Sequence, residues 1–581
     1  MRSLAALMLM CTPLALAAQA SPTTQFRALL RDEWEWELRT YPTRATSVGD
    51  RRYDDRLGSV APAALAQRAD SMRHYLARLA RIAPARLSPA DRVNHAMLER
   101  RLREDIEGIT SRDERLPILA DAGFHTAIAG LPSSAPHGTV AEVERYLQRL
   151  RQIPRLFLEN VANMRVGIAD GFTMPRVVLD GYETTIAPHL VATPDSSVFF
   201  APLRALPAAM PERDRARLRA LARTIIVDSV IPAYRDFGAF MRDEYIPRAR
   251  TTIAARDLPD GEAYYRRQIR IYTTLDLTPD SVHALGLSEV ARIRAEMDAA
   301  MRRTGFTGTF AEFLQFLRTD PRFTPKSEEE LLMRASYIAK RMDNKLPALF
   351  RTLPRQPYGV VPVPAHIAPK YTAGRYSGAP LGGTRAGEYW VNLYDLPSRK
   401  LYALEALTLH EAVPGHHLQV ALAKEMTDLP PFRRDEYISA FGEGWGLYAE
   451  RLGLEAGFYT DPYSDFGRLT YEMWRACRLV VDTGIHWKGW SRQQAMDYMA
   501  ANTALPLLEV RTETDRYISW PGQALAYKFG ELTIRRLRAE AEQALGGRFD
   551  IRAFHDAVLR NGSVPLPVLE REVRGWVRSV R

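Results

Sequence analysis

Cysteine is nearly absent from this chain of 581 residues, which contains only Cys11 and Cys477. Cys11 lies within residues 1–20, where Arg2 precedes an apolar run that ends in the small-residue pattern Ala-Gln-Ala. This organisation is typical of a signal peptide, here cleaved near Ala20. Cleavage would leave Cys477 alone, so we expect no intramolecular disulfide and a fold held together by its apolar core.

Long apolar runs are also lacking. No stretch after residue 20 has the roughly 18 consecutive apolar residues of a membrane span. Two alternatives to cleavage concern the N-terminus: a short membrane anchor, and lipid attachment at Cys11. The apolar run is short for a bilayer, and Met10 is a poor match to the small residue expected before a lipid-modified cysteine. We expect an exported protein, periplasmic or secreted, with no membrane span.

Charge of one sign is not concentrated anywhere. The formal net charge is +10, but the 79 Lys and Arg residues alternate with 69 Asp and Glu residues along the chain. Neither a long basic block nor an interleaved basic and aromatic surface is visible, so nucleic-acid binding is not expected. A hydrophobic content of 46% and a charged content of 25% are ordinary for a globular protein.

Helical periodicity dominates the first half of the chain. Val93, Leu98, Leu102 and Ile106 recur at helical spacing in a highly charged stretch. We therefore predict a mainly α-helical fold. Similar amphipathic runs occupy residues 143–153, 211–247, 281–303 and 326–351.

Residues 352–400 interrupt this pattern with proline, glycine and tyrosine. EYWVNLY at 388–394 alternates as a strand does, and GAPLGGTRAG at 378–387 is typical of the preceding loop. An edge strand or hairpin here could bind an extended substrate backbone, with Asn392 as a candidate contact. The equally weighted alternative is a structural hairpin that covers the helices.

The sequence HEAVPGHH at 410–417 is followed by Glu443 in FGEGWGLYAERLG. Zinc binds neutral imidazoles and carboxylates, and a catalytic site leaves one position for water. A nearby carboxylate can then accept the proton of that water. The pattern therefore predicts a hydrolase with one zinc ion per chain and with Glu411 as general base. The alternative is a kinked helix that carries solvent-exposed or core histidines.

The spacing of these histidines departs from HExxH, because Pro414 stands four residues after His410. In a regular helix His410 and His416 would lie about 9 Å apart along the axis and point roughly 120° apart. Pro414 lacks an N–H, and Gly415 permits unusual backbone angles, so a bulge at Val413–Pro414 is favoured. We therefore predict that His410, His416 and Glu443 bind the metal. His417 is the rival for the second position.

Further polar residues are candidates for the surroundings of the metal. Glu450 lies seven residues after Glu443, and a polar series on the next predicted helix ends in His486. RYISWPGQALAYKFG at 516–530 offers Arg516, Tyr517 and Tyr527 as donors to a developing oxyanion, with Tyr517 slightly preferred over Tyr527. The alternatives are ordinary ion pairs for the charged residues and core packing for the tyrosines.

Several of these segments resemble the bacterial "domain of unknown function 885" family. They are HEAVPGHHLQ, GEGWGLYAE, RACRLVVDTGIH, RYISWPGQALAYKFG and YPTRATSVGDRRYDDRL at 41–57, which together span nearly the whole mature chain. That family is similar to helical zinc peptidases such as angiotensin-converting enzyme, thimet-type oligopeptidases and thermostable carboxypeptidases. The resemblance implies a two-lobed, zincin-like metallopeptidase fold with a deep cleft. It also implies that His410, His416 and Glu443 occupy the metal positions.

We accordingly expect a helical part at 21–355 that forms cleft walls and a metal-site region at 356–581, joined in one catalytic unit. The expected activity is zinc-dependent hydrolysis of short peptides. One alternative is a zinc hydrolase of a non-peptide amide or ester. Another is a non-catalytic metal-binding or peptide-binding protein of the same fold, against which the presence of Glu411 argues.

Overall fold

The computed structural model describes residues 21–365, 367–379 and 385–581. The predicted signal peptide at 1–20 lies outside these residues. The protein is 70% helix and 3% strand, which confirms the mainly α-helical expectation. Within the described part of the chain, none of the helices combines the length and the apolar character of a membrane span.

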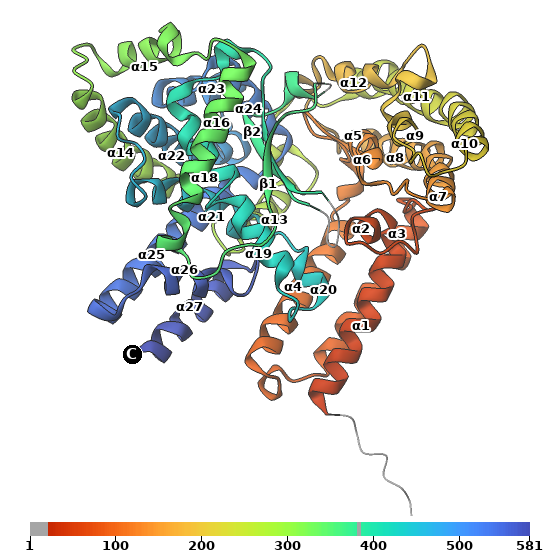
Figure 1. Cartoon of the computed structure of the whole chain (residues 1–581), viewed down its shortest axis with the longest axis horizontal. Coiled ribbons are helices and arrows are strands. Elements are labelled where there is room, and N and C mark those ends of the chain that lie inside the picture. Colours follow the sequence, from red (N-terminus) through yellow and green to blue (C-terminus); the bar gives the residue numbers. More distant parts are fainter. Residues whose placement is uncertain (1–20, 366, 380–384) are drawn as a thin grey trace, which may run out of the picture.

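The first twelve helices lie on the right of Figure 1, with α1 and α4 at the bottom of the view and α5 to α12 above them. The predicted helical spacing is confirmed here: Val93, Leu98 and Leu102 are buried on α4, and Val143 and Leu147 are buried on α7. The helices are α1 (Pro22–Thr40), α2 (Pro42–Ser47), α3 (Pro62–Ala80), α4 (Pro89–Thr110), α5 (Phe124–Ala129), α6 (Leu131–Ser134), α7 (Val140–Leu150), α8 (Ile153–Ala169), α9 (Ala201–Arg204), α10 (Glu212–Ile225), α11 (Ile231–Phe240) and α12 (Ile246–Arg248).

Most of the later helices lie on the left of the view, whereas α19 and α20 lie near the middle, with α20 next to α4. Among the later helices, α22 is buried at every position from Asp465 to Thr483. α14 packs along α22, and α21 packs along α25. A helix that is enclosed on all sides marks the centre of the core, and Cys477 lies on it as a buried residue. These helices are α13 (Gly261–Thr273), α14 (Pro279–Arg303), α15 (Phe310–Thr319), α16 (Glu328–Asp343), α17 (Leu346–Leu349), α18 (Leu404–Glu411), α19 (His416–Glu425), α20 (Pro431–Arg434), α21 (Ser439–Glu455), α22 (Pro462–Thr483), α23 (Arg492–Asn502), α24 (Leu507–Ser519), α25 (Ala526–Leu545), α26 (Ile551–Leu559) and α27 (Leu566–Val580).

A small sheet precedes the metal-site helices and has the strand order β1 (Tyr358–Pro362), β3 (Gly387–Val391), β2 (Gly374–Ser377). β3 pairs in parallel with β1 and antiparallel with β2. The predicted strand is therefore present, but the expectation that it is an edge strand is wrong, because β3 is paired on both sides. The strand with an open edge on the site is β2. Part of the predicted loop, at 380–384, lies outside the described residues.

Candidate metal centre

The helix is interrupted between His410 and His416, where Pro414 and Gly415 predicted a bulge at Val413–Pro414, but the interruption is longer than predicted and spans residues 412–415. α18 ends at Glu411 and α19 begins at His416, with a cis peptide bond between Val413 and Pro414. Gly415 packs so closely that an added Cβ would lie 1.9 Å from the carbonyl oxygen of His410. Only glycine fits this close approach. Because Gly415 packs against the carbonyl of His410, the start of α19 lies close to the end of α18.

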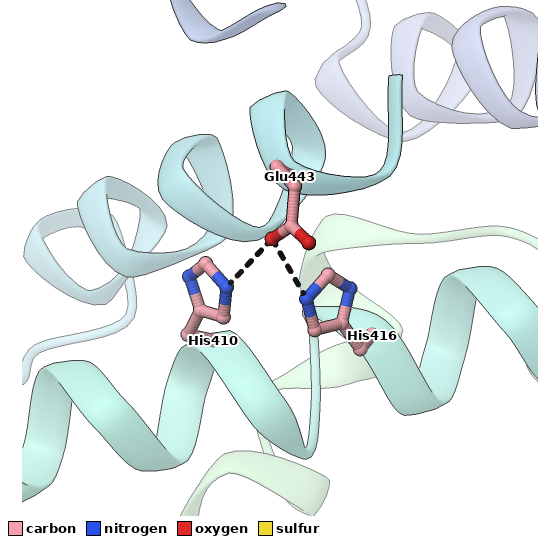
Figure 2. Close-up of side chains that lie close together, drawn as sticks. All are labelled: His410, His416 and Glu443. Atoms are coloured by element: carbon pink, nitrogen blue, oxygen red, sulfur yellow. Dashed lines mark ion pairs between the residues drawn. The ribbon is translucent and has the colours of Figure 1, made fainter. Parts of the chain in front are cut away.

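The break brings His410, His416 and Glu443 together, and Figure 2 shows both imidazoles turned toward one carboxylate. Glu443 Oε2 lies 3.5 Å from His410 Nε2 and 3.3 Å from His416 Nε2. One candidate ligand atom from each residue lies within 4.8 Å of the other two. Two imidazole nitrogens and a carboxylate oxygen at this separation are a donor set that fits zinc.

His417, the rival to His416, faces a different part of the molecule. Its Nδ1 lies 3.0 Å from the hydroxyl oxygen of Tyr376, and its ring centroid lies 4.4 Å from that of Tyr358. Burial lowers the pKa of His417 to about 4, so its imidazole is neutral at physiological pH. Of the two adjacent histidines, the structure directs His416 toward Glu443.

Neighbouring residues hold the ring of His410 in place. His410 Nδ1–H donates to Glu450 Oε1 at 2.8 Å, and Arg475 Nη2 lies 3.2 Å from the same oxygen. A carboxylate on the second ring nitrogen orients a metal-binding imidazole and fixes its tautomer. Gly446 makes room for the ring, because an added Cβ would lie 2.6 Å from Cε1 of His410. Glu450 thus lies beside the cluster, where the sequence had placed it.

Tyr437 contacts the other oxygen of Glu443, and no pattern in the sequence predicted this contact. Its hydroxyl donates to Glu443 Oε1 at 3.0 Å, and it lines the same cavity. Tyr437 precedes α21 and belongs to no motif that the sequence made visible. Its contact shows that Glu443 is held from two sides, with Oε2 directed at the histidines.

The electrostatics of the cluster favour a cation. Burial opposes protonation of His410, but its hydrogen bonds to Glu443 and Glu450 outweigh that cost and raise its pKa to about 10. Burial also opposes the charge of Glu443, yet the two histidines hold its pKa well below the ordinary value. The carboxylates therefore require positive charge among them. A divalent cation would satisfy this requirement and would take the place of the proton on the imidazole.

Glu411 lies beside the cluster on the wall of a cavity of about 540 Å³. Its Oε2 accepts a hydrogen bond from the backbone N–H of Tyr376 on β2, at 2.7 Å. His410, His416 and Glu443 line the same cavity, whose wall residues all fall between Thr372 and Ser563. The carboxylate is thus positioned by the edge strand and faces the same space as the candidate ligands.

Two of the three predicted oxyanion donors, Tyr527 and Arg516, line this cavity. The ring of Tyr527 lies nearly parallel to that of His410, with 6.3 Å between centroids, and Arg516 Nη2 lies 3.5 Å from its hydroxyl. Tyr517 is buried away from the cavity wall, and its hydroxyl accepts hydrogen bonds from Trp474 and Arg478. Tyr527, which the sequence ranked second, is the tyrosine that faces the site.

One known protein family matches nearly the whole chain. The family described as "Bacterial protein of unknown function (DUF885)" matches residues 42–573. The chain belongs to the DUF885 family. This confirms the family resemblance, whereas the similarity to helical zinc peptidases stays a prediction.

Two solved structures resemble this DUF885 protein along its whole length. A "putative lipoprotein" of Colwellia psychrerythraea superimposes with a TM-score of 0.90 at 28% identity, covering 96% of this chain and 100% of that one. A "putative lipoprotein of unknown function" of Shewanella oneidensis gives a TM-score of 0.68 at 16% identity, over 95% and 99% of the chains, and shows the fold alone. Among curated proteins none matches the sequence.

His486, predicted near the metal, and Asn392, predicted as a substrate contact, lie elsewhere and bind backbone. His486 Nδ1 accepts from the N–H of Ala255 at 3.0 Å, and its Nε2–H donates to the carbonyl of Tyr517 at 2.9 Å. The Asn392 amide donates to three carbonyls between Ala368 and Thr372, in the loop before β2. Neither residue lines the metal-site cavity. Both hold distant segments together, a role that residue type and spacing do not reveal.

Proposed function

We propose that this DUF885 protein is a zinc-dependent hydrolase that cleaves short peptides. The observation that carries the proposal is the convergence of His410, His416 and Glu443 beside Glu411 on one cavity wall. Two histidines and one carboxylate are a donor set of catalytic zinc sites, in which a fourth position is left for water. Purely structural zinc sites are usually closed by four protein ligands, commonly with cysteine.

In this proposal His410, His416 and Glu443 hold the ion. When bound, zinc supplies a Lewis acid and makes a water molecule more acidic at this place. Glu411, oriented by the N–H of Tyr376, accepts the proton of the attacking water and returns it to the leaving amine. The hydroxyl of Tyr527 donates to the developing oxyanion, and Arg516 holds that hydroxyl.

The open edge of β2 supports a peptide as the substrate. The N–H of Asn392 donates to the carbonyl of Ala373 at 2.9 Å, and inward-facing and outward-facing residues alternate along an antiparallel pair. Gly374 and Tyr376 therefore turn their backbone groups away from β3, and both residues line the cavity. Because the N–H of Tyr376 is held by Glu411, a substrate would pair with the N–H of Gly374 and with the carbonyls of the two residues. An extended peptide can add to such an edge through main-chain hydrogen bonds.

We also propose that the protein has a two-lobed, zincin-like fold. Its cleft would admit only extended chains. Close packing of α14, from the N-terminal part, along α22 supports a single catalytic unit. The cavity volume is in the range of sites that enclose small ligands. The role of residues 21–355 as cleft walls remains a prediction. A stable folded protein should therefore resist cleavage.

The test combines metal analysis with a peptide digest of the mature protein. We expect one zinc ion per chain and cleavage of a mixed oligopeptide library, lost on treatment with a chelator and restored by zinc. A stable folded protein serves as the resistant control. Zinc binding without cleavage of any peptide would instead favour hydrolysis of a non-peptide amide or ester.

We also propose that the protein is exported and cleaved near Ala20. The two solved relatives carry the description of putative lipoproteins, which supports export and gives weight to the alternative at Cys11. Mass spectrometry of the mature protein distinguishes the two. A chain that starts at Ser21 supports cleavage by a signal peptidase, whereas a lipid-modified Cys11 at the N-terminus contradicts it.

A further inference from the structure

Four arginines from three separate elements line one part of the metal-site cavity. Arg375 lies on β2, Arg475 and Arg478 on α22, and Arg516 on α24. Tyr527 connects this group to the metal cluster, because its ring lies against His410. The guanidinium carbon of Arg478 lies 4.2 Å from the centroid of that same ring. The ring of Tyr527 is therefore adjacent to both the positive charge of Arg478 and the imidazole of His410.

Too few carboxylates balance these four charges. Glu513 serves both Arg478, at 2.9 Å, and Arg516, at 3.1 Å. Glu450, which pairs with Arg475, also holds His410. Arg375 lies over the ring of Tyr371 at 4.9 Å and forms no ion pair with any residue that the structure describes.

Two further carboxyl groups lie near, Glu509 and Asp121, but both are weak partners. Glu509 interacts with Arg475 and Arg478, yet burial dominates and raises its pKa to about 7. The charge of Asp121 interacts with Arg516 and Arg375, yet burial dominates and raises the pKa of Asp121 above its ordinary value. It forms no ion pair within the described part of the chain. The cavity thus keeps an excess of positive charge beside Tyr527.

Hydrogen-bond donors in this group are also unused. Arg475 Nε, Arg478 Nη1 and Arg516 Nε are buried without an acceptor among the described residues, and Arg478 as a whole is 1% exposed. Buried charged donors are nearly always paired in proteins, because leaving them unpaired is costly. An anionic ligand would supply the missing charge, and a carboxylate matches the planar fork of a guanidinium.

Arg375 and Arg516 are the members of the group that can contact a ligand directly. The side chain of Arg375 is exposed, and that of Arg516 is 13% exposed, whereas Arg475 and Arg478 are almost fully enclosed. Their charges act on one another, as expected for two guanidinium groups that share one cavity. The enclosed pair adds positive potential from behind Trp474 and Tyr527.

We propose that the C-terminal carboxylate of the substrate binds between Arg375 and Arg516, so that the enzyme releases residues from peptide C-termini. This inference rests on the proposed peptidase function. Arg375 directly precedes Tyr376, whose N–H holds Glu411. Arg516 Nη2 also lies 3.5 Å from the hydroxyl of Tyr527, the proposed oxyanion donor, so a carboxylate bound at Arg516 lies close to the reacting carbonyl. The bond that is cut therefore lies one or two residues from the end.

A matched pair of peptides tests this assignment. One oligopeptide carries a free C-terminal carboxylate, and the other has the same sequence with a C-terminal amide. We expect the acid to be preferred by about tenfold or more in kcat/KM, mainly through KM, because the lost contact is charge-assisted. Products one or two residues shorter than the substrate are expected by mass spectrometry.

Variants connect that preference to the arginine. Arg375→Ala should bring the ratio of acid to amide close to one, and Arg375→Lys should restore part of it, since lysine keeps the charge but lacks the fork. Lys424→Ala is the matched control, because Lys424 is another cation of the cavity wall that donates to the carbonyl of Ala379. This variant should leave the ratio unchanged.

Binding to zinc-loaded Glu411→Gln protein separates this inference from the peptidase function. Calorimetry should show tighter binding of the acid than of the amide even without turnover. Equal cleavage of acid and amide by the unaltered enzyme would overturn the inference and leave the peptidase intact. A preference that follows an internal acidic side chain, whatever the C-terminus, would overturn it too. If neither peptide is cut, the peptidase proposal fails, and the binding comparison still decides the carboxylate site.

Discussion

The pKa values of two buried histidines are shifted in opposite directions. These histidines are His410 on α18 and His486 in the π-helical turn Gly484–Lys488. Both are almost fully enclosed, at 2% and 0% exposure. The pKa of His486 is lowered to about 3, chiefly by burial, and its partners are a backbone N–H and a backbone carbonyl. The pKa of His410 is raised to about 10, because Glu443 and Glu450 outweigh the same burial cost.

The comparison teaches that partners, and not burial, mark a site. His486 is satisfied as a neutral imidazole and connects Ala255 to Tyr517. His410 lies among carboxylates that require a cation. His125 and His555 resemble His486, because burial lowers their pKa values to about 3 and about 4. Only in the cluster of His410 does the described chain gather histidine and carboxylate ligand atoms at metal-binding separation.

The largest expected effect comes from changing the residue that would do chemistry while keeping the cluster itself. Glu411→Gln removes the proton acceptor but preserves its size and the hydrogen bond from Tyr376. Peptide turnover should fall by about 10²–10⁴-fold, with zinc still bound. Steady-state kinetics and metal analysis check this, with Glu436→Gln, another carboxylate of the cavity wall, as the control. Unchanged turnover would mean that Glu411 is not the base.

His416 and His417, which are adjacent on α19, provide a second comparison between an imidazole that binds a cation and one that has a structural role. His416→Ala should abolish stoichiometric zinc after dialysis, because it removes a candidate ligand from a set of three. His417→Ala should retain zinc, since His417 contacts Tyr376 and Tyr358 instead. Elemental analysis of both variants is the measurement. The reverse outcome would show that the register across the break is wrong.

Glu450 tests whether the carboxylate behind His410 matters for the metal. Glu450→Gln keeps a hydrogen-bond acceptor for Nδ1–H but removes the charge. Zinc affinity should fall by about 10–100-fold, as is common when such a partner is changed. Competition with a chelator measures this affinity. An unaltered affinity would assign Glu450 to the ion pair with Arg475 alone.

The smallest effect is expected at His486 and should leave zinc affinity unchanged. His486→Leu leaves the N–H of Ala255 without its acceptor, at a cost of about 1–3 kcal/mol in unfolding free energy. In the unfolded chain His486 takes up a proton below its ordinary pKa of about 6.5. In the folded protein its pKa is about 3, so it stays neutral down to that pH. His486 therefore makes the protein less stable as the pH falls through this window.

Denaturant unfolding of the zinc-loaded protein at several pH values measures both parts of that prediction. Between pH 6 and pH 4 the unfolding free energy of the variant should fall less steeply with decreasing pH, by up to about 1.4 kcal/mol per pH unit. Identical slopes for variant and parent would show that His486 is protonated in the folded state. A lower zinc affinity would place it in the metal site after all.

Local backbone chemistry explains what the sequence predicted well. Pro414 and Gly415 constrain the chain at the point where His410 and His416 must meet, so the break and the choice of His416 followed from neighbouring residues. The family resemblance, also carried by short motifs, extended this to Glu443. Glu450 followed from its spacing along α21.

Long-range packing decided what the sequence could not predict. Whether β3 is central depends on its pairing with two separate segments, and its alternation alone does not show this. Tyr517 and Tyr527 lie ten residues apart in one segment, yet only Tyr527 faces the cavity. Arg375 lies on β2 and Tyr437 lies just before α21. Neither residue belongs to a sequence motif that would have predicted its place in the site.

The most direct test of the account is the position of the metal. Crystals of the mature protein grown with zinc, measured on both sides of the zinc absorption edge, should show one anomalous peak per chain. We predict that it is bound by Nε2 of His410, Nε2 of His416 and a carboxylate oxygen of Glu443, with Glu411 beside it on the cavity wall. A peak bound by other residues, or no peak in this cluster at saturating zinc, would contradict the account.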